Sequence, residues 1–119
     1  MDIKKFAKEK IKRHCTVCNF KLASIALSHS GEVIASATNK RASGVISEFS
    51  EHAEEALVRR LKKLSAIERY KYIDVMVLRM KKNGEFGLAK PCPGCYRLLT
   101  NYGVRNIYYT DSDGKIILQ

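Results

Sequence analysis

The stretches FSEHAE (residues 49–54) and PCPGC (residues 91–95) decide how this chain is interpreted. The first contains a histidine, and the second contains two cysteines in a Cys-x-x-Cys arrangement behind a proline. Imidazole nitrogen and thiolate sulfur are ligands that zinc prefers in proteins. His52, Cys92 and Cys95 are therefore candidate zinc ligands, and three protein ligands leave the fourth tetrahedral position open for water.

Glu54 follows the candidate histidine by two residues and is not needed as a ligand. We therefore expect its carboxylate to lie beside the open zinc position and to transfer the protons of the water there. A His-x-Glu motif alone is weak, because any helix start can contain both residues. A redox Cys-x-x-Cys is the competing interpretation of residues 92–95, but it would leave the upstream motif unexplained.

The length and composition are typical of one globular domain, which we expect to span residues 1–119. Hydrophobic residues make up 45% and charged residues 29% of the chain, and no apolar run approaches the ~20 residues that span a bilayer. Residues 1–12 lack the apolar core of a secretory signal. We therefore expect a cytoplasmic protein with no membrane partner, in which Cys-x-x-Cys pairs bind metal more readily than they form disulfides.

The chain is strongly basic, with 22 Lys and Arg against 12 Asp and Glu and a net charge of +10. Such a surface favours anionic partners, either nucleotide phosphates or a polynucleotide strand. A solvated surface with no partner is the alternative, and charge alone does not decide between them. The bases cluster at Lys4, Lys5, Lys8, Lys10, Lys12 and Arg13, at Arg59, Arg60, Lys62 and Lys63, and at Lys81 and Lys82.

Hydrophobic periodicity predicts an alternation of helices and strands. The expected elements are a helix at 2–13, strands at 20–27 and 32–38, a helix at 50–64, a strand at 71–80, a helix at 95–102, and strands at 104–110 and 115–118. The first two strands and the last two are each expected to form a hairpin. The strands at 71–80 and 104–110 flank a helix and should therefore be parallel.

Both motifs are expected at helix N-termini. Ser50 is a suitable N-cap for the helix that carries the first motif. Pro93 suits the first position of the second helix, and Gly103 should end it. Because the positive end of a helix favours thiolate, we expect the pKa of Cys92 and Cys95 to be lowered.

A second group of possible ligands, His14, Cys15 and Cys18, is the least explained feature of the chain. These residues could form a second zinc site, or the two cysteine pairs could share one Cys₄ site. The separation of the two pairs is far longer than the roughly 15–20 residues of a compact zinc ribbon. We favour small, half-buried thiols in a turn between helix and strand.

With these motifs in place, residues 20–118 resemble the cytidine deaminase superfamily. The resemblance depends on HAE at 52–54 and PCPGC at 91–95, and FKLASIAL at 20–27 is similar to the first strand of that family. GEVIAS at 31–36, followed by Asn39, is similar to its second strand and substrate-contacting asparagine. The resemblance implies an α/β fold of three α/β/α layers, with a mixed five-stranded sheet and helices on both faces.

The resemblance also implies an activity. This is the zinc-dependent hydrolytic deamination of a cytosine nucleoside or nucleotide to the uracil form, with release of ammonia. The resemblance implies that Glu54 is the catalytic acid and base and that the His52, Cys92 and Cys95 side chains are zinc ligands. It also implies a homo-oligomeric state. Substrate contacts are implied for Phe20, Asn39 and Ala53.

The sequence departs from the free-nucleoside branch at two places. His52 stands where that branch usually has a cysteine, which is more similar to the deoxycytidylate, tRNA-adenosine and polynucleotide-editing branches. The Phe-Asn-x-Glu-Asn substrate motif is absent, since TNKR occupies residues 38–41. The expected C-terminal hairpin, in contrast, is similar to the free-nucleoside branch. A polynucleotide cytosine or adenine deaminase and a non-catalytic, zinc-stabilised nucleic-acid-binding module therefore stay as alternatives.

Overall fold

The computed structural model describes residues 2–14, 21–38, 53–81 and 83–119. Helices and strands alternate along these segments, as the periodicity predicts. In chain order they are α1 (Ile3–His14), β1 (Lys21–Ser28), β2 (Val33–Thr38), α2 (Ala53–Lys63), α3 (Ala66–Arg69), β3 (Ile73–Met80), β4 (Phe86–Gly87), α4 (Pro93–Tyr102), β5 (Asn106–Thr110) and β6 (Ile116–Leu118).

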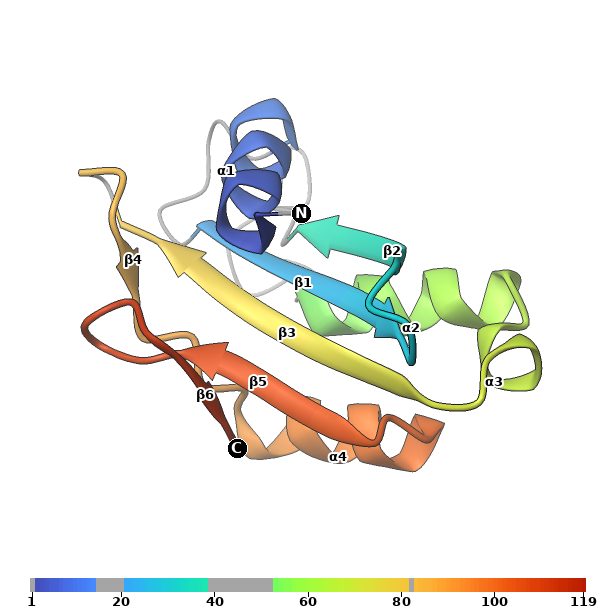
Figure 1. The fold of residues 1–119 in the computed structure, drawn as a ribbon. Coiled ribbons are helices and arrows are strands. Elements are labelled where there is room, and N and C mark those ends of the chain that lie inside the picture. Colours follow the sequence, from blue (N-terminus) through green and yellow to red (C-terminus); the bar gives the residue numbers. More distant parts are fainter. Residues whose placement is uncertain (1, 15–20, 39–52, 82) are drawn as a thin grey trace, which may run out of the picture.

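The strands form one mixed sheet in the order β2-β1-β3-β5-β6, with β4 also paired to β3 (Figure 1). β3 and β5 are parallel, whereas β1–β2, β1–β3, β3–β4 and β5–β6 are antiparallel. The predicted hairpins and the predicted parallel pair are thus confirmed. The sheet has six strands rather than five, because the two residues of β4 pair with β3 beyond the end of β5.

Helices cover both faces of the sheet, as expected for three α/β/α layers (Figure 1). On one face, Ala7 and Ile11 of α1 pack against Ala23, Ile25 and Leu78. Asp2 caps α1, since its Oδ1 accepts hydrogen bonds from the backbone N–H groups of the first turn.

The opposite face carries α2 and α4. Leu57 and Leu61 of α2 and Leu99 of α4 are fully buried against the sheet, where they meet Val75 and Ile107 among others. β3 lies in the middle of the sheet and has buried apolar residues on both of its faces. This packing fixes the N-termini of α2 and α4, which carry the two sequence motifs.

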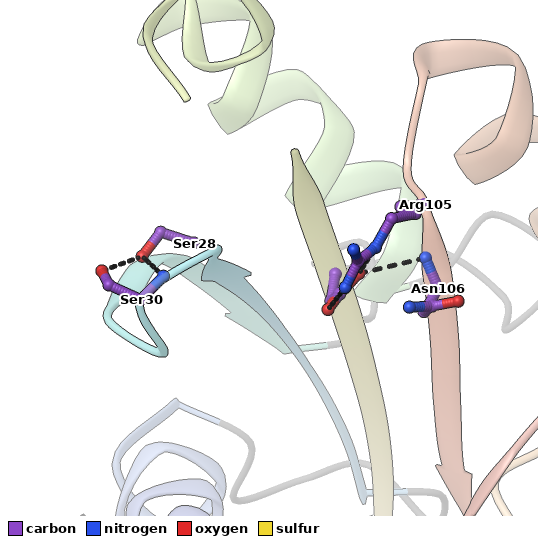
Figure 2. Close-up of polar contacts among 5 residues, drawn as sticks. Ser28, Ser30, Arg105 and Asn106 are labelled. Carbon is purple, nitrogen blue, oxygen red and sulfur yellow. Dashed lines mark hydrogen bonds and ion pairs between the residues drawn. The ribbon is translucent and has the colours of Figure 1, made fainter. Parts of the chain in front are cut away.

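The parallel pair is held at its start by a cluster of polar contacts at the N-terminal end of β3 (Figure 2). Arg105 Nε and Nη2 donate to the two carboxylate oxygens of Asp74 at 3.3 and 3.2 Å, and the Asn106 N–H donates to Asp74 Oδ1 at 3.1 Å. The Arg105 guanidinium also lies over the Tyr72 ring, 3.4 Å from its centroid. These contacts fix the register of β5 on β3.

The outer strand β2 is bound by a side chain of helix α2. The guanidinium of Arg60, on α2, donates a hydrogen bond to the backbone carbonyl of Ser36. The β1–β2 turn is closed by Ser28, whose hydroxyl is 2.9 Å from that of Ser30 (Figure 2).

Two of the described helices differ from the prediction. The short helix α3 was not predicted; it begins after Ser65, whose backbone is left-handed. α4 begins at Pro93 rather than at Cys95. The predicted start of α2 at Ser50 lies outside the described residues, and the helix is seen from Ala53. None of the described helices is long and apolar enough to cross a membrane.

Candidate active site

Glu54 lies in the first turn of α2 and is buried, with only 4% of its surface exposed. The helix start is attached to the sheet by a hydrogen bond of 2.8 Å from the Ser24 hydroxyl on β1 to the Ala53 carbonyl. Within the described segments, Glu54 Oε1 has no hydrogen-bond partner. Because a buried polar atom without a partner is costly, this oxygen is positioned for a water molecule or a substrate group.

The cysteine pair lies at the start of α4. Cys92 is the N-cap residue and is exposed, Pro93 occupies the first turn, and Cys95 is buried. Gly103 ends the helix with a φ of 117°, a left-handed conformation that glycine adopts without strain. The predicted stop at Gly103 and the place of Pro93 in the first helical position are confirmed, although the helix begins before the predicted range of 95–102.

The Cys95 thiol interacts with the side chains of both Glu54 and Cys92. Burial raises the pKa of Cys95 well above its ordinary value, and the nearby Glu54 carboxylate raises it further. The prediction that the helix N-terminus lowers the pKa of this thiol is therefore wrong, because burial and a neighbouring negative charge outweigh the helix dipole. The contact itself places the catalytic candidate beside the cysteine pair, although the two lie far apart in the sequence.

A cavity of about 260 Å³ opens beside Glu54 and Cys92. Its walls come from the start of β1, the end of β3 and the segment that leads to α4. The lining residues are Leu22, Glu54, Val77, Arg79, Leu88, Ala89, Lys90, Pro91 and Cys92. The cavity therefore combines apolar walls, one carboxylate and two cationic side chains around the candidate catalytic group.

The other predicted site residues divide into two groups. Ala53 is buried next to Glu54, and its carbonyl accepts the Ser24 hydroxyl. Phe20, Asn39 and His52 lie outside the described residues, as do Cys15 and Cys18. The structure thus brings together Glu54, Cys92 and Cys95 but describes only two of the three predicted zinc ligands.

The described donors suit zinc. No group of three or more His, Cys, Asp or Glu side chains within the described ranges forms a complete metal site. The two neighbouring thiols nevertheless provide sulfur ligands, and Glu54 Oε1, which has no partner among the described residues, provides an acceptor for a water proton. A divalent cation would also offset the negative charge of the buried Glu54 carboxylate and of the thiolates that form when the metal binds.

Thr110, at the end of β5, holds the cavity wall in place and was not identified from the sequence. Its side chain is fully buried, and its hydroxyl donates to the Gly87 carbonyl at 2.6 Å and accepts from the Arg79 N–H at 3.4 Å. The Thr110 carbonyl accepts from the Ala89 N–H at 2.8 Å. One residue therefore ties β3 and β5 to the segment that carries the cysteine pair.

We expect Thr110→Val to lower the free energy of unfolding by about 1–3 kcal/mol, because valine fits the space but leaves the buried Gly87 carbonyl without its donor. Denaturant unfolding measures this change. Thr100→Val is the matched control: Thr100 is exposed, and its hydroxyl donates to backbone carbonyls of its own helix, those of Tyr96 and Arg97. Equal losses in the two variants would contradict the role of Thr110.

Comparison with known proteins agrees with this geometry. Residues 2–111 match the family described as the cytidine and deoxycytidylate deaminase zinc-binding region. No curated protein sequence matches the chain.

Solved structures of two enzyme types share the fold. Cytidine deaminase from Mycobacterium leprae superimposes with a TM-score of 0.64 at 17% identity, covering 97% of this chain and 88% of that one. The apo dCMP deaminase from the cyanophage S-TIM5 gives a TM-score of 0.60 at 21% identity, covering 92% and 83%. At these identities the likeness establishes the fold, and the match over residues 2–111 establishes the family. The chain belongs to the cytidine and deoxycytidylate deaminases that carry this zinc-binding region.

Proposed function

We propose that the protein hydrolytically deaminates a cytosine nucleoside or nucleotide, namely cytidine, deoxycytidine or a monophosphate of either, to the uracil form. Family membership supports a hydrolytic deaminase. The observation that carries the proposal is the buried Glu54 carboxylate, which has one oxygen without a partner among the described residues and lies against the Cys95 thiol. A binding module would gain nothing from a buried carboxylate in this position.

The proposed zinc ligands are His52, Cys92 and Cys95. When bound there, zinc would act as a Lewis acid and make a water molecule nucleophilic near neutral pH. The Cys92 and Cys95 sulfurs would serve as thiolates, so both thiols must lose their protons as the metal binds. The N-terminal position of α4 holds this pair in a fixed geometry.

Glu54 would then move the protons of the reaction. Its carboxylate accepts a proton from the water as the water oxygen bonds to C4 of the cytosine ring. Glu54 delivers that proton to N3 of the ring, and it transfers the second water proton to the 4-amino group. The C4–N bond breaks, ammonia leaves and the uracil form is released, so one water is consumed for each ammonia formed. Burial helps by keeping solvent away from the carboxylate.

Substrate contacts are proposed for Phe20, Asn39 and Ala53. Ala53 begins the described part of α2, and the first backbone N–H groups of a helix have no partner within the helix. Its N–H is therefore a suitable donor to a carbonyl oxygen of the base. A cytoplasmic location and a homo-oligomeric state stay predictions from sequence and resemblance.

The assay that tests this function supplies cytidine, deoxycytidine, dCMP, single-stranded DNA and RNA separately, and follows ammonia release and base identity. We expect uracil products from at least one small substrate and loss of turnover after zinc is removed by a chelator. Activity on strands alone would replace the proposed substrate class with a polynucleotide. No turnover of any substrate, combined with tight and salt-sensitive nucleic-acid binding, would contradict an enzyme and support a binding module.

A further inference from the structure

Arg79 is a cationic residue in the wall of the candidate active site that no sequence motif indicated. It lies near the end of β3, is half-buried, and lines the same cavity as Glu54 and Cys92. Side chains two residues apart on a strand point to the same face, and Val77 lines the cavity as well. The position of Arg79 in the strand therefore directs its side chain towards the site.

The backbone of Arg79 is fixed on both sides. In the sheet register it pairs with Leu22 of β1 and with Gly87 of β4. Its N–H also donates to the buried Thr110 hydroxyl. A guanidinium that projects from so rigid a base can bind a ligand with little loss of conformational freedom.

The position of Arg79 relative to Glu54 suits a nucleotide. The register pairs Val77 with Ser24, whose hydroxyl binds the carbonyl of Ala53, so this point of the sheet lies beside the start of α2. Arg79 is two residues further along β3, a shift of about 7 Å towards the end of the strand. In a nucleotide, the pentose likewise separates the phosphate from the base. A base at Glu54 would therefore have its phosphate on the side of Arg79.

The charges of the cavity also favour an anion. Two of its lining residues are cationic, Arg79 and Lys90, and one is acidic, Glu54. In the proposed function, the two positive charges of zinc would be neutralised by its two thiolate ligands. Bound zinc would therefore not change the net positive charge of the cavity lining. Arginine pairs with phosphate through two parallel hydrogen bonds, which gives it a geometric preference that lysine lacks.

We propose that Arg79, assisted by Lys90, binds the phosphate of the substrate, which is therefore a cytosine nucleoside monophosphate rather than a free nucleoside. This inference rests on the proposed function, because it assumes that the base lies at Glu54. In this proposal, the specificity for a nucleotide over a nucleoside depends mainly on the Arg79 side chain of β3.

The test compares deamination of dCMP with that of deoxycytidine, as the ratio of the two kcat/KM values. A ratio is insensitive to partial misfolding, which lowers both values equally. The wild type is expected to favour dCMP, and Arg79→Gln should reduce the ratio about 10- to 100-fold, the effect of losing a charged hydrogen bond. Arg79→Lys should retain part of the preference. Lys62→Gln, which removes an exposed cation of α2 outside the cavity lining, should leave the ratio unchanged.

Binding measurements separate this inference from the proposed function, since they need no turnover. Calorimetry with dUMP and deoxyuridine should show tighter binding of dUMP, and Arg79→Gln should weaken dUMP binding about 10- to 100-fold. Equal wild-type affinities for dUMP and deoxyuridine, or a preference for dUMP that is unchanged in Arg79→Gln, would overturn the role of Arg79. Neither result would contradict the proposed deaminase activity. Turnover of strands alone would also overturn the role of Arg79. Arg79-dependent dUMP binding without any deamination would instead contradict the proposed function.

Discussion

Glu54→Gln is expected to give a folded, zinc-loaded protein whose kcat is lower by about 10²- to 10⁴-fold, the usual contribution of a general acid and base. Glutamine has nearly the shape of glutamate, so the buried position beside Cys95 stays filled. Its amide, however, cannot accept a proton from water or return one to the ring. Steady-state kinetics on the preferred substrate, together with zinc content and thermal unfolding of the same preparation, measures the effect.

Glu55→Gln is the matched control, because Glu55 is the next residue of α2 and is exposed. The two variants remove the same charge from the same helix turn, so a general electrostatic effect would appear in both. We expect near wild-type kcat in the control. Retained deamination in Glu54→Gln would remove Glu54 from its proposed role, whatever the metal content.

The second large effect is expected for Cys95→Ser, which should lose both zinc and turnover. A serine hydroxyl is a poor zinc ligand compared with a thiolate, and the buried position of Cys95 allows no nearby substitute from solvent. Metal analysis of the purified protein should find about one zinc per wild-type chain and almost none in the variant. Turnover should fall to the background rate.

Cys18→Ser provides the comparison, since it removes a thiol from the other cysteine pair. We expect this variant to keep its zinc, in line with the interpretation of Cys15 and Cys18 as structural thiols. Two zinc ions per wild-type chain, one of them lost in Cys18→Ser, would show instead that the N-terminal pair binds a second metal. Full zinc content in Cys95→Ser would rule out Cys95 as a ligand.

Most of the fold followed from local sequence patterns. Hydrophobic periodicity predicted the strand at 71–80 that the structure shows as β3, and the two predicted hairpins are the pairs β1–β2 and β5–β6. The missed elements are short. β4 contains two residues and exists only because the end of β3 lies beside it, and α3 contains four. Such elements have too few residues to show a periodicity.

The candidate site was predictable to a lesser extent. The zinc chemistry shared by the two motifs predicted that Glu54 would lie beside the cysteine pair, and the structure places it against Cys95. The raised pKa of Cys95 depends on burial between elements distant in sequence, so the helix position alone gave the wrong direction. Arg79 and Thr110 had no motif to mark them, because their roles depend on which strand ends meet at the cavity.

The contact between Arg60 and the Ser36 carbonyl has a consequence for behaviour at high concentration. An outer strand with free backbone groups is a template on which another chain can add a strand, which is a common route to aggregation. On β2, the guanidinium binds the Ser36 carbonyl and places a positive charge at this outer strand. A second molecule approaching this edge must displace the arginine and overcome repulsion between two chains that each carry a net charge of +10.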